Sequence, residues 1–101
     1  MELGRIAGTV VATQKSEGLA GYKLLVVDLL KTDGKTTGTN LVAVDTVGAG
    51  MGETVIVVRG SSARQAEGMT TVPVDASIIA IVDSIEVEGK VRFKKSKDKW
   101  I

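Results

Sequence analysis

The chain has 101 residues, of which 44% are hydrophobic and 3% aromatic, and its formal net charge is +1. That length suits one domain with a modest core, and the hydrophobic content argues against disorder. Cysteine and histidine are both absent, which excludes disulfides and histidine-based acid–base chemistry and disfavours a zinc site. We therefore expect neither a bound metal nor a cofactor.

The N-terminal stretch MELGRIAGTVVATQ lacks the basic and apolar regions of a signal peptide. No apolar run approaches the roughly 20 residues that a membrane-spanning helix needs. These features predict a soluble cytoplasmic protein without a membrane partner.

The first segments of the chain favour a strand followed by a loop. Residues 5–13 are rich in β-branched side chains, and Gly8 within them indicates a bulge or a barrel bend. Residues 14–21 are polar and rich in glycine, which predicts a loop.

Residues 22–31 form an apolar run that is too long for a bare edge strand, and a short buried helix is an alternative there. Residues 32–35 favour a hairpin turn, because Gly34 accepts the positive φ that such turns need. Residues 41–44 are then the predicted return strand.

The second half of the chain also predicts mainly strands. Residues 54–59, TVIVVR, are the clearest strand, and residues 78–87 are predicted as another. A turn is expected at 88–89, followed by a short pairing at 91–93. Several short strands joined by turns are typical of a small all-β barrel or sandwich.

One short helix is predicted over residues 62–67. Ser62 and Gln65 fit a capping box, and Gly68 stands where a left-handed C-terminal cap is expected. A helix of under two turns is stable only when packing holds it in place.

Closely spaced glycines at positions 48, 50 and 52 raise the question of a phosphate-binding loop. A dinucleotide fingerprint needs a different glycine spacing and a helix directly after it, whereas a predicted strand follows here. No Gly-Lys-Ser or Gly-Lys-Thr follows either, so a Walker loop is also disfavoured. The remaining interpretation is a tight turn or the close approach of another chain.

Small residues framed by arginines follow the strand at 54–59. Ser61 and Ser62 lie between Arg59 and Arg64, a combination that suits a packed subunit contact. Either serine could instead act as a nucleophile, but its base would have to be a lysine or a carboxylate.

Three aspartates have two possible uses. Asp45, Asp75 and Asp83 could include an acid–base pair, although their spacing places no two of them together. Fixing loops or forming salt bridges with Arg59 or Arg64 is the alternative use.

The C-terminal end is basic. Residues 90–101 carry six basic side chains and one acidic one, a local balance of +5, so residues 1–89 sum to −4. The end is either a solvated terminus or a tail that docks on the acidic body of a neighbouring copy. Trp100 and Ile101 either bury in a neighbouring protein or form a frayed terminus, and we expect the frayed terminus.

Seven short motifs stand in a specific order and spacing along nearly the whole chain. They are GTVV at 8–11, KLL at 23–25, DTVGAG at 45–50, GE at 52–53, RGSSARQ at 59–65, PVD at 73–75 and IVD at 81–83. In this pattern the chain resembles the vertex proteins of bacterial microcompartments, the EutN/CcmL family. The part after Lys95 contributes nothing to the resemblance.

The resemblance implies a five-stranded barrel of the oligonucleotide-binding (OB) topology, closed or partly open, with one short helix. Residues 1–95 would form this domain and residues 96–101 a basic tail. Five copies would form a ring at the vertices of a polyhedral shell around metabolic enzymes in the bacterial cytoplasm. The implied partners are other copies of the chain and hexameric shell proteins, and no catalysis is expected.

Within such a ring, we expect Gly48, Ala49 and Gly50 to lie near a subunit contact or the ring axis. Ser61, Ser62 and Arg64 are the candidates for contacts between subunits.

A single-stranded nucleic-acid-binding module is the alternative function, because OB barrels also occur there. Such binders stack bases on aromatic side chains in a basic groove. Here the body of the chain is acidic, and Tyr22, Phe93 and Trp100 are the only aromatic residues. The sequence therefore predicts no nucleic-acid partner, and the missing histidine and cysteine disfavour a small enzyme.

Overall fold

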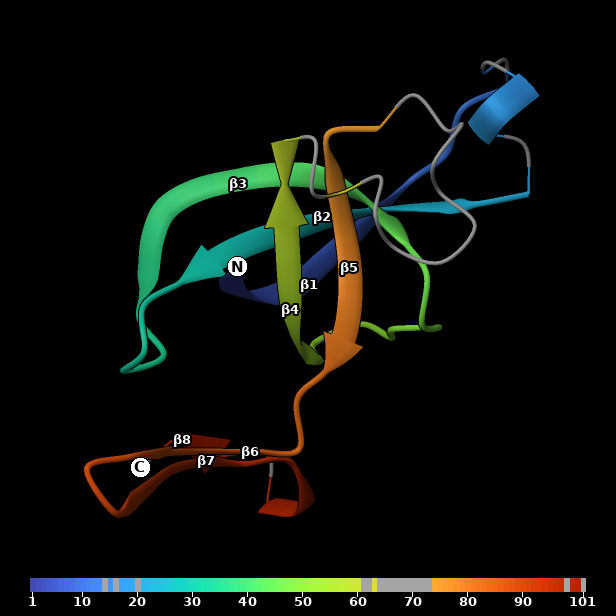
Figure 1. Cartoon of the computed structure of the whole chain (residues 1–101). Coiled ribbons are helices and arrows are strands. Elements are labelled where there is room, and N and C mark those ends of the chain that lie inside the picture. The colour runs from blue at the N-terminus through green and yellow to red at the C-terminus, as the bar shows by residue number, and fades with distance from the viewer. Residues whose placement is uncertain are drawn as a thin grey trace.

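The computed structural model describes residues 1–13, 15, 17–19, 21–60, 63, 74–97 and 99–100. Five strands close into a barrel in the order β1-β2-β3-β5-β4, as the family resemblance implies (Figure 1). The strands are β1 (Glu2–Val10), β2 (Lys23–Leu30), β3 (Thr36–Asp45), β4 (Thr54–Arg59) and β5 (Ala76–Ile81). All their contacts are antiparallel except for the short parallel contact between β3 and β5.

A second, three-stranded sheet follows the barrel, and we call it the C-terminal sheet. It consists of β6 (Ser84–Val87), β7 (Lys90–Lys94) and β8 (Lys99–Trp100) in that spatial order. Two short 3₁₀ turns, η1 (Glu17–Leu19) and η3 (Lys95–Lys97), complete the described elements. The molecule measures 44 × 24 × 24 Å, because the C-terminal sheet lies beyond one end of the barrel (Figure 1).

The structure corrects two predicted elements. The apolar run at 22–31 contains strand β2 and no helix, since it pairs with β1 on one side and β3 on the other. The predicted single strand at 78–87 is two strands, because β5 ends at Ile81 and the chain leaves the barrel at Val82 and Asp83. There the Val82 N–H donates to the Thr54 carbonyl oxygen instead of extending β5. Apart from Ala63, the predicted helix at 62–67 lies outside the described residues.

Two short-range predictions for the first half of the chain, a bulge and a hairpin turn, are confirmed. The pairing of β1 with β2 shifts register between Ile6 and Gly8, which is the bulge expected there. The hairpin turn closes where the Lys31 N–H donates to the Lys35 carbonyl at 2.8 Å, and Gly34 has a φ of 87°.

The end of the chain is ordered differently from the expected frayed terminus. Trp100 belongs to β8, pairs with Phe93 of β7 and packs on its ring at a centroid distance of 4.9 Å. The frayed-end prediction is therefore wrong for Trp100, because this aromatic contact holds it. The boundary expected after residue 95 falls within η3, whereas the barrel itself ends at Ile81.

Branched aliphatic side chains fill the barrel. Alternate residues of each strand point inward, as the pleat requires, and ten buried residues form the main core. They are Ile6, Leu25, Val27, Leu29, Ala43, Ala49, Val55, Val57, Ala76 and Ile78. A smaller cluster lies outside the barrel wall, where Val44 is covered by Leu19, Tyr22, Leu24 and Val74.

Candidate subunit interface

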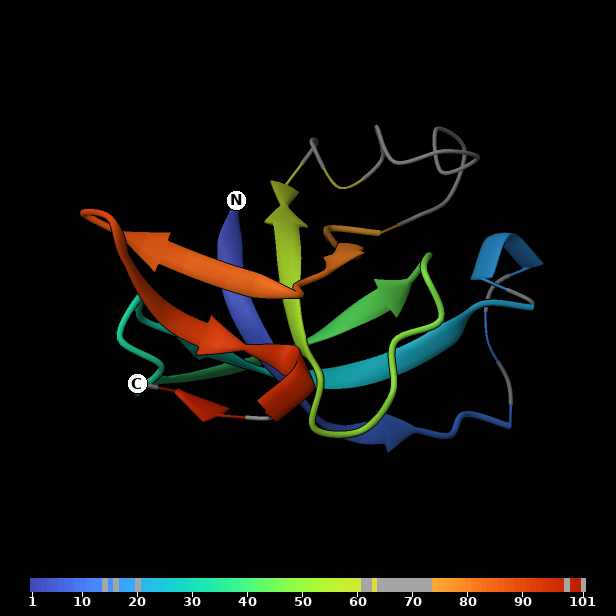
Figure 2. The ribbon, with the colours of Figure 1, turned by 90° about the horizontal axis from the view of Figure 1, so that it is seen from below.

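The segment between β3 and β4, residues 46–53, is the glycine loop, drawn in yellow-green in Figure 2. Asp45 ends β3, and its carboxylate accepts three backbone hydrogen bonds from this loop. Oδ1 accepts from the N–H groups of Val47 and Gly48, each at 3.1 Å, and Oδ2 accepts from Ala49 at 2.9 Å. A phosphate would need such N–H groups, so the internal carboxylate already occupies the place of an anionic ligand.

A second carboxylate holds the other end of the glycine loop. Glu53 Oε1 accepts the Gly50 N–H at 2.5 Å, while Oε2 pairs with the ammonium of Lys95 at 2.8 Å. These contacts lower the pKa of the Glu53 carboxyl below its usual 4.5, first through Lys95 and then through the Gly50 N–H. The same hydrogen bond to Glu53 raises the pKa of Lys95.

The glycine loop is also attached to strand β1. The Gly52 N–H donates to the Ile6 carbonyl at 2.9 Å, and the Ile6 N–H donates to the Glu53 carbonyl at 3.0 Å. Ala49 is 3% exposed and its methyl group belongs to the barrel core. The loop is therefore a rigid part of the barrel, and a large side chain at position 49 would disturb the fold before it disturbed any contact with another chain.

The outer surface of the glycine loop carries apolar side chains and glycines. Met51 is 69% exposed and Val47 is 39% exposed. Gly48 and Gly52 have φ values of +77° and +79°, and apart from the adjacent residues no atom of the described chain lies within 4 Å of the place where a Cβ would stand. Their backbone conformation alone requires glycine, and the space beside them is open.

Arg59 has a partner that the sequence analysis missed. Its Nε and Nη2 donate to the two carboxylate oxygens of Glu2 at 2.6 and 2.8 Å, which ties β4 to the start of β1. This pair raises the pKa of Arg59 and lowers that of Glu2, in each case chiefly through the hydrogen bond between them. Asp75, an expected partner, adds only a weaker electrostatic contribution to Arg59. No sequence signal joins two residues that stand 57 positions apart.

Asp75 and Asp83 are exposed and contribute mainly through their backbone. The carbonyl of Asp75 accepts the Gly60 N–H at 2.7 Å, and that of Asp83 accepts the Lys95 N–H at 2.8 Å. The structure therefore brings together no two of the three aspartates as an acid–base pair.

The candidate contact residues Ser61, Ser62 and Arg64 lie outside the described residues. Ala63, which stands among them, is fully buried, and its carbonyl accepts a 2.8 Å hydrogen bond from the buried Ser77 hydroxyl. This bond anchors position 63 to the barrel.

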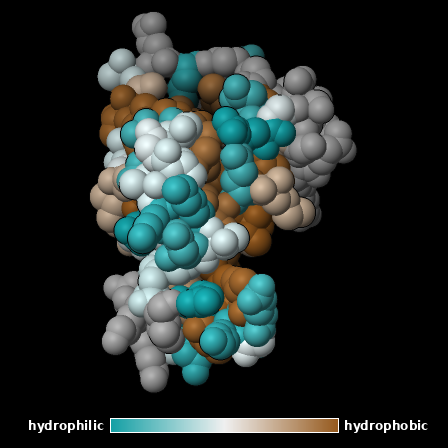
Figure 3. Space-filling view, turned by 90° about the vertical axis from the view of Figure 1, so that its left-hand side faces the viewer, coloured by the Kyte–Doolittle hydropathy of each residue, from teal (hydrophilic) through white to brown (hydrophobic). Residues whose placement is uncertain are grey.

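An apolar groove of about 530 Å³ opens on another side of the barrel. Figure 3 looks onto this side, where hydrophobic residues in brown lie between pale and teal polar ones. Its apolar walls are Met1, Leu3, Leu29, Leu30 and Ile56.

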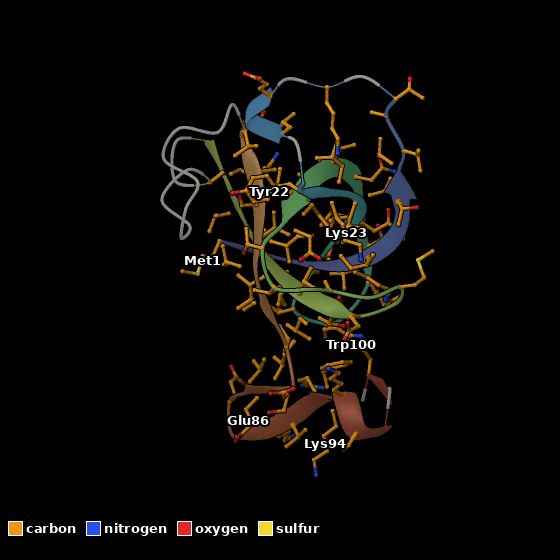
Figure 4. The ribbon with its side chains drawn as sticks, turned by 90° about the vertical axis from the view of Figure 1, so that its right-hand side faces the viewer. Met1, Tyr22, Lys23, Glu86, Lys94 and Trp100 are labelled. Atoms are coloured by element: carbon orange, nitrogen blue, oxygen red, sulfur yellow. The ribbon has the colours of Figure 1, made fainter. Side chains whose placement is uncertain are left out.

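The three aromatic side chains do not form a base-stacking platform. Tyr22 covers Val44 outside the barrel, whereas Phe93 is buried and Trp100 packs on it. Figure 4 shows Tyr22 and Trp100 far apart on the molecule.

The described part of the chain lacks two further features. It holds no group of three or more acidic side chains placed to bind one metal ion. None of its helical turns has the length and apolar character of a membrane-spanning helix.

Comparison with known proteins links this barrel to one family. The family model described as ethanolamine utilisation protein EutN/carboxysome matches residues 1–83, which is the barrel without the C-terminal sheet. The chain is 45% identical to the microcompartment shell vertex protein EutN of Salmonella typhimurium, over 94% of this chain and 96% of that protein.

Solved structures show the same fold. CcmL of Gloeobacter violaceus, a carboxysome shell vertex protein, superposes with a TM-score of 0.90 at 41% identity, over 95% of this chain and 99% of that one. The pentameric microcompartment shell protein GrpN of Rhodospirillum rubrum superposes with a TM-score of 0.79 at 50% identity, over 86% and 99% of the two chains.

Proposed function

Because the chain belongs to the EutN/CcmL family, we propose that it is a structural shell protein whose rings of five close the vertices of a bacterial microcompartment. The observation that carries this proposal is its similarity along nearly the whole chain to proteins named as shell vertex proteins, one of them pentameric. The compartment lies in the bacterial cytoplasm, and hexameric shell proteins are the neighbours of each ring. The protein works by assembly, without catalysis and without a nucleic-acid partner.

The physical requirement for such a ring is a stiff subunit with two different contact surfaces. A heterologous contact closes only if each copy is rotated by the same angle, so a subunit that bends would give open or mixed assemblies. The closed barrel and the glycine loop held by Asp45 and Glu53 support the proposal, since both restrict bending.

Native mass spectrometry tests the function directly. We expect the purified protein to have the mass of five chains of 10.5 kDa each. Coexpression with hexameric shell proteins should then give closed particles, and omission of this chain should leave shells with open corners in electron micrographs. A protein that stays monomeric at high concentration would contradict the proposal.

The glycine loop, with Gly48, Ala49 and Gly50, is our candidate for one contact surface, and Ser61, Ser62 and Arg64 are candidates for its polar part. The exposed Met51 gives a test that leaves the core intact. Met51→Glu would place a charge in a desolvated contact. The equilibrium constant for dissociation of a subunit from the ring should therefore rise at least about tenfold, which corresponds to about 1.4 kcal/mol.

The matched control for Met51→Glu is Val11→Glu. Val11 is 90% exposed and lies just beyond β1, outside the glycine loop. Equal subunit dissociation in both variants, measured by mass photometry on dilution, would argue against the loop as a contact surface.

A further inference from the structure

The C-terminal sheet begins at Ser84, directly after the segment that matches the family model, and Lys95, in the η3 turn that joins β7 to β8, forms an ion pair with Glu53 of the glycine loop. We propose that Lys95, acting through Glu53, makes the C-terminal sheet a positioning element for the glycine loop. The consequence for ring assembly rests on the proposed function. The effect on the loop itself does not.

Glu53 can couple the position of Lys95 to that of Gly50, because its two carboxylate oxygens have different partners. Oε1 holds the Gly50 N–H within the glycine loop, and Oε2 holds the ammonium of Lys95. A carboxylate turns as one rigid group, so the partner of one oxygen helps to fix the direction of the other. Without Lys95, the Gly50 N–H would be the one partner left among the described residues to fix the direction of the Glu53 carboxylate.

The C-terminal sheet in turn fixes Lys95. Lys95 opens η3 directly after β7, and its N–H donates to the Asp83 carbonyl at 2.8 Å. Its backbone is therefore held at the junction between the C-terminal sheet and the barrel, and only its side chain reaches the glycine loop.

A second contact, made by Trp100, keeps the C-terminal sheet on the barrel. Gly34, at the tip of the hairpin between β2 and β3, lies directly against the Trp100 ring, and no Cβ would fit between them. Figure 4 shows Trp100 at the boundary between the barrel and the C-terminal sheet. The sheet thus has one anchor on the hairpin and another on the glycine loop.

Between these two anchors a cavity interrupts the contact of the C-terminal sheet with the barrel. A cavity of about 310 Å³ lies there, lined by Arg5, Gly52, Thr54, Phe93 and Trp100. At this place a cavity separates Gly52 of the loop from Phe93 and Trp100, and among the described residues the Glu53–Lys95 ion pair connects the loop to the segment that follows β7.

The test compares Lys95→Met with Lys94→Met. Lys94 is the neighbouring exposed lysine, makes no ion pair among the described residues and points away from the barrel (Figure 4). Hydrogen exchange of the Gly50 amide, measured on the protein in its native assembly, should become about two- to fivefold faster in Lys95→Met, the range expected for a partly exposed ion pair. In Lys94→Met it should stay at the wild-type rate.

The single tryptophan of the chain reports separately on the C-terminal sheet, because Trp100 emission responds to its packing. Unchanged Gly50 exchange in Lys95→Met would overturn the proposal, whether or not Trp100 emission shifts. If Lys95→Met does not fold, Lys95→Ala serves instead, since it removes the ammonium that pairs with Glu53 and leaves the Glu53 carboxylate unchanged as the acceptor of the Gly50 N–H. Faster Gly50 exchange supports the proposal there too, and an unchanged rate overturns it.

The hydrogen-exchange measurement and the subunit count test the two proposals separately. A wild-type protein that is not a ring of five would contradict the proposed function, yet the ratio of exchange rates would still test the coupling between Lys95 and the loop. In a protein that does form rings, dilution should dissociate the Lys95→Met rings at a higher protein concentration than the Lys94→Met rings.

Discussion

At the scale of single residues, the same amino acid meets different demands at different places. Gly34 and Gly38 have nearly equal φ values, +87° and +85°. A Cβ on Gly34 would collide with the Trp100 ring, whereas at Gly38 no described atom outside the adjacent residues lies within 4 Å of the corresponding position. Gly34 is required both by its positive φ and by the contact with Trp100, whereas Gly38 is required by its positive φ alone.

This pair provides a matched prediction. Gly38→Ala should lower the free energy of unfolding by about 1–2 kcal/mol, the cost of a left-handed conformation with a side chain. Gly34→Ala should cost about 1–3 kcal/mol more, because the added methyl group displaces the Trp100 ring. Urea unfolding measures both losses, and only Gly34→Ala should shift the emission of Trp100. Equal losses would mean that the Trp100 contact adds nothing to stability.

Asp45 offers a second prediction at this scale. Asp45→Ala leaves three loop N–H groups without their acceptor, and hydrogen bonds to a charged group contribute more than neutral ones. We expect a loss of about 2–4 kcal/mol in unfolding free energy, and a smaller loss of about 1–2 kcal/mol for Asp45→Asn, which keeps one acceptor oxygen. Chemical denaturation measures both. A negligible effect of Asp45→Ala would show that solvent satisfies the loop equally well.

At the scale of elements, the narrow interior of the barrel constrains strand β1. Gly4 is buried and pairs with Leu29 of β2 on one side and Val55 of β4 on the other. A Cβ there would stand closer to Val27 Cγ1 than any non-bonded contact allows. A glycine in the middle of a strand is unfavourable by itself, but here it lets three strands curve tightly around one core.

Gly4→Ala should therefore destabilise the fold by about 1–3 kcal/mol through overpacking. Val27→Ala removes the methyl group that the new Cβ would meet, so the penalty of Gly4→Ala should shrink by about 1 kcal/mol or more in that background. A double-mutant cycle from urea unfolding gives this coupling. Strictly additive losses would assign the penalty to the Asp28 carbonyl oxygen, which lies 3.2 Å from the same position.

At the scale of the whole molecule, two ion pairs join parts of the chain that are distant in sequence. Glu2–Arg59 ties β1 to β4, and Glu53–Lys95 ties the glycine loop to the C-terminal sheet. In both pairs the pKa of the folded glutamate lies below the ordinary value of 4.5. A lowered folded pKa means stabilisation that is complete above the unfolded pKa and disappears as the pH falls through the folded pKa.

Stability should therefore be flat near neutral pH and decrease as the pH drops below about 4.5. Glu2→Gln combined with Glu53→Gln should remove part of this decrease, because neither side chain can then gain a proton. Urea midpoints measured at several pH values follow the change. Glu86→Gln is the control, since Glu86 is exposed and makes no ion pair among the described residues. Identical pH profiles for the wild type and the double variant would contradict the prediction.

Short-range features of this protein could be predicted from the residues alone. The strand at 54–59, the bulge near Gly8 and the hairpin turn at Gly34 depend on β-propensity and on backbone freedom over a few residues. Those same residues left a barrel and a sandwich as equal possibilities. The five-stranded barrel was predicted only through the family motifs.

The tertiary structure decided which residues meet. The β1–β4 pairing that closes the barrel brings Arg59 to Glu2, the exit of the chain at Val82 starts a second sheet, and that sheet carries Lys95 to Glu53. Such contacts depend on barrel closure and on the direction in which a strand leaves it, and neither is encoded in any short stretch. The sequence determined most of the strands, the turns and the aliphatic character of the core because these follow from local chemistry, but it did not determine the break between β5 and β6. Only the closed fold determined the ion pairs and the Trp100 contact, because they join surfaces that come together after the core has formed.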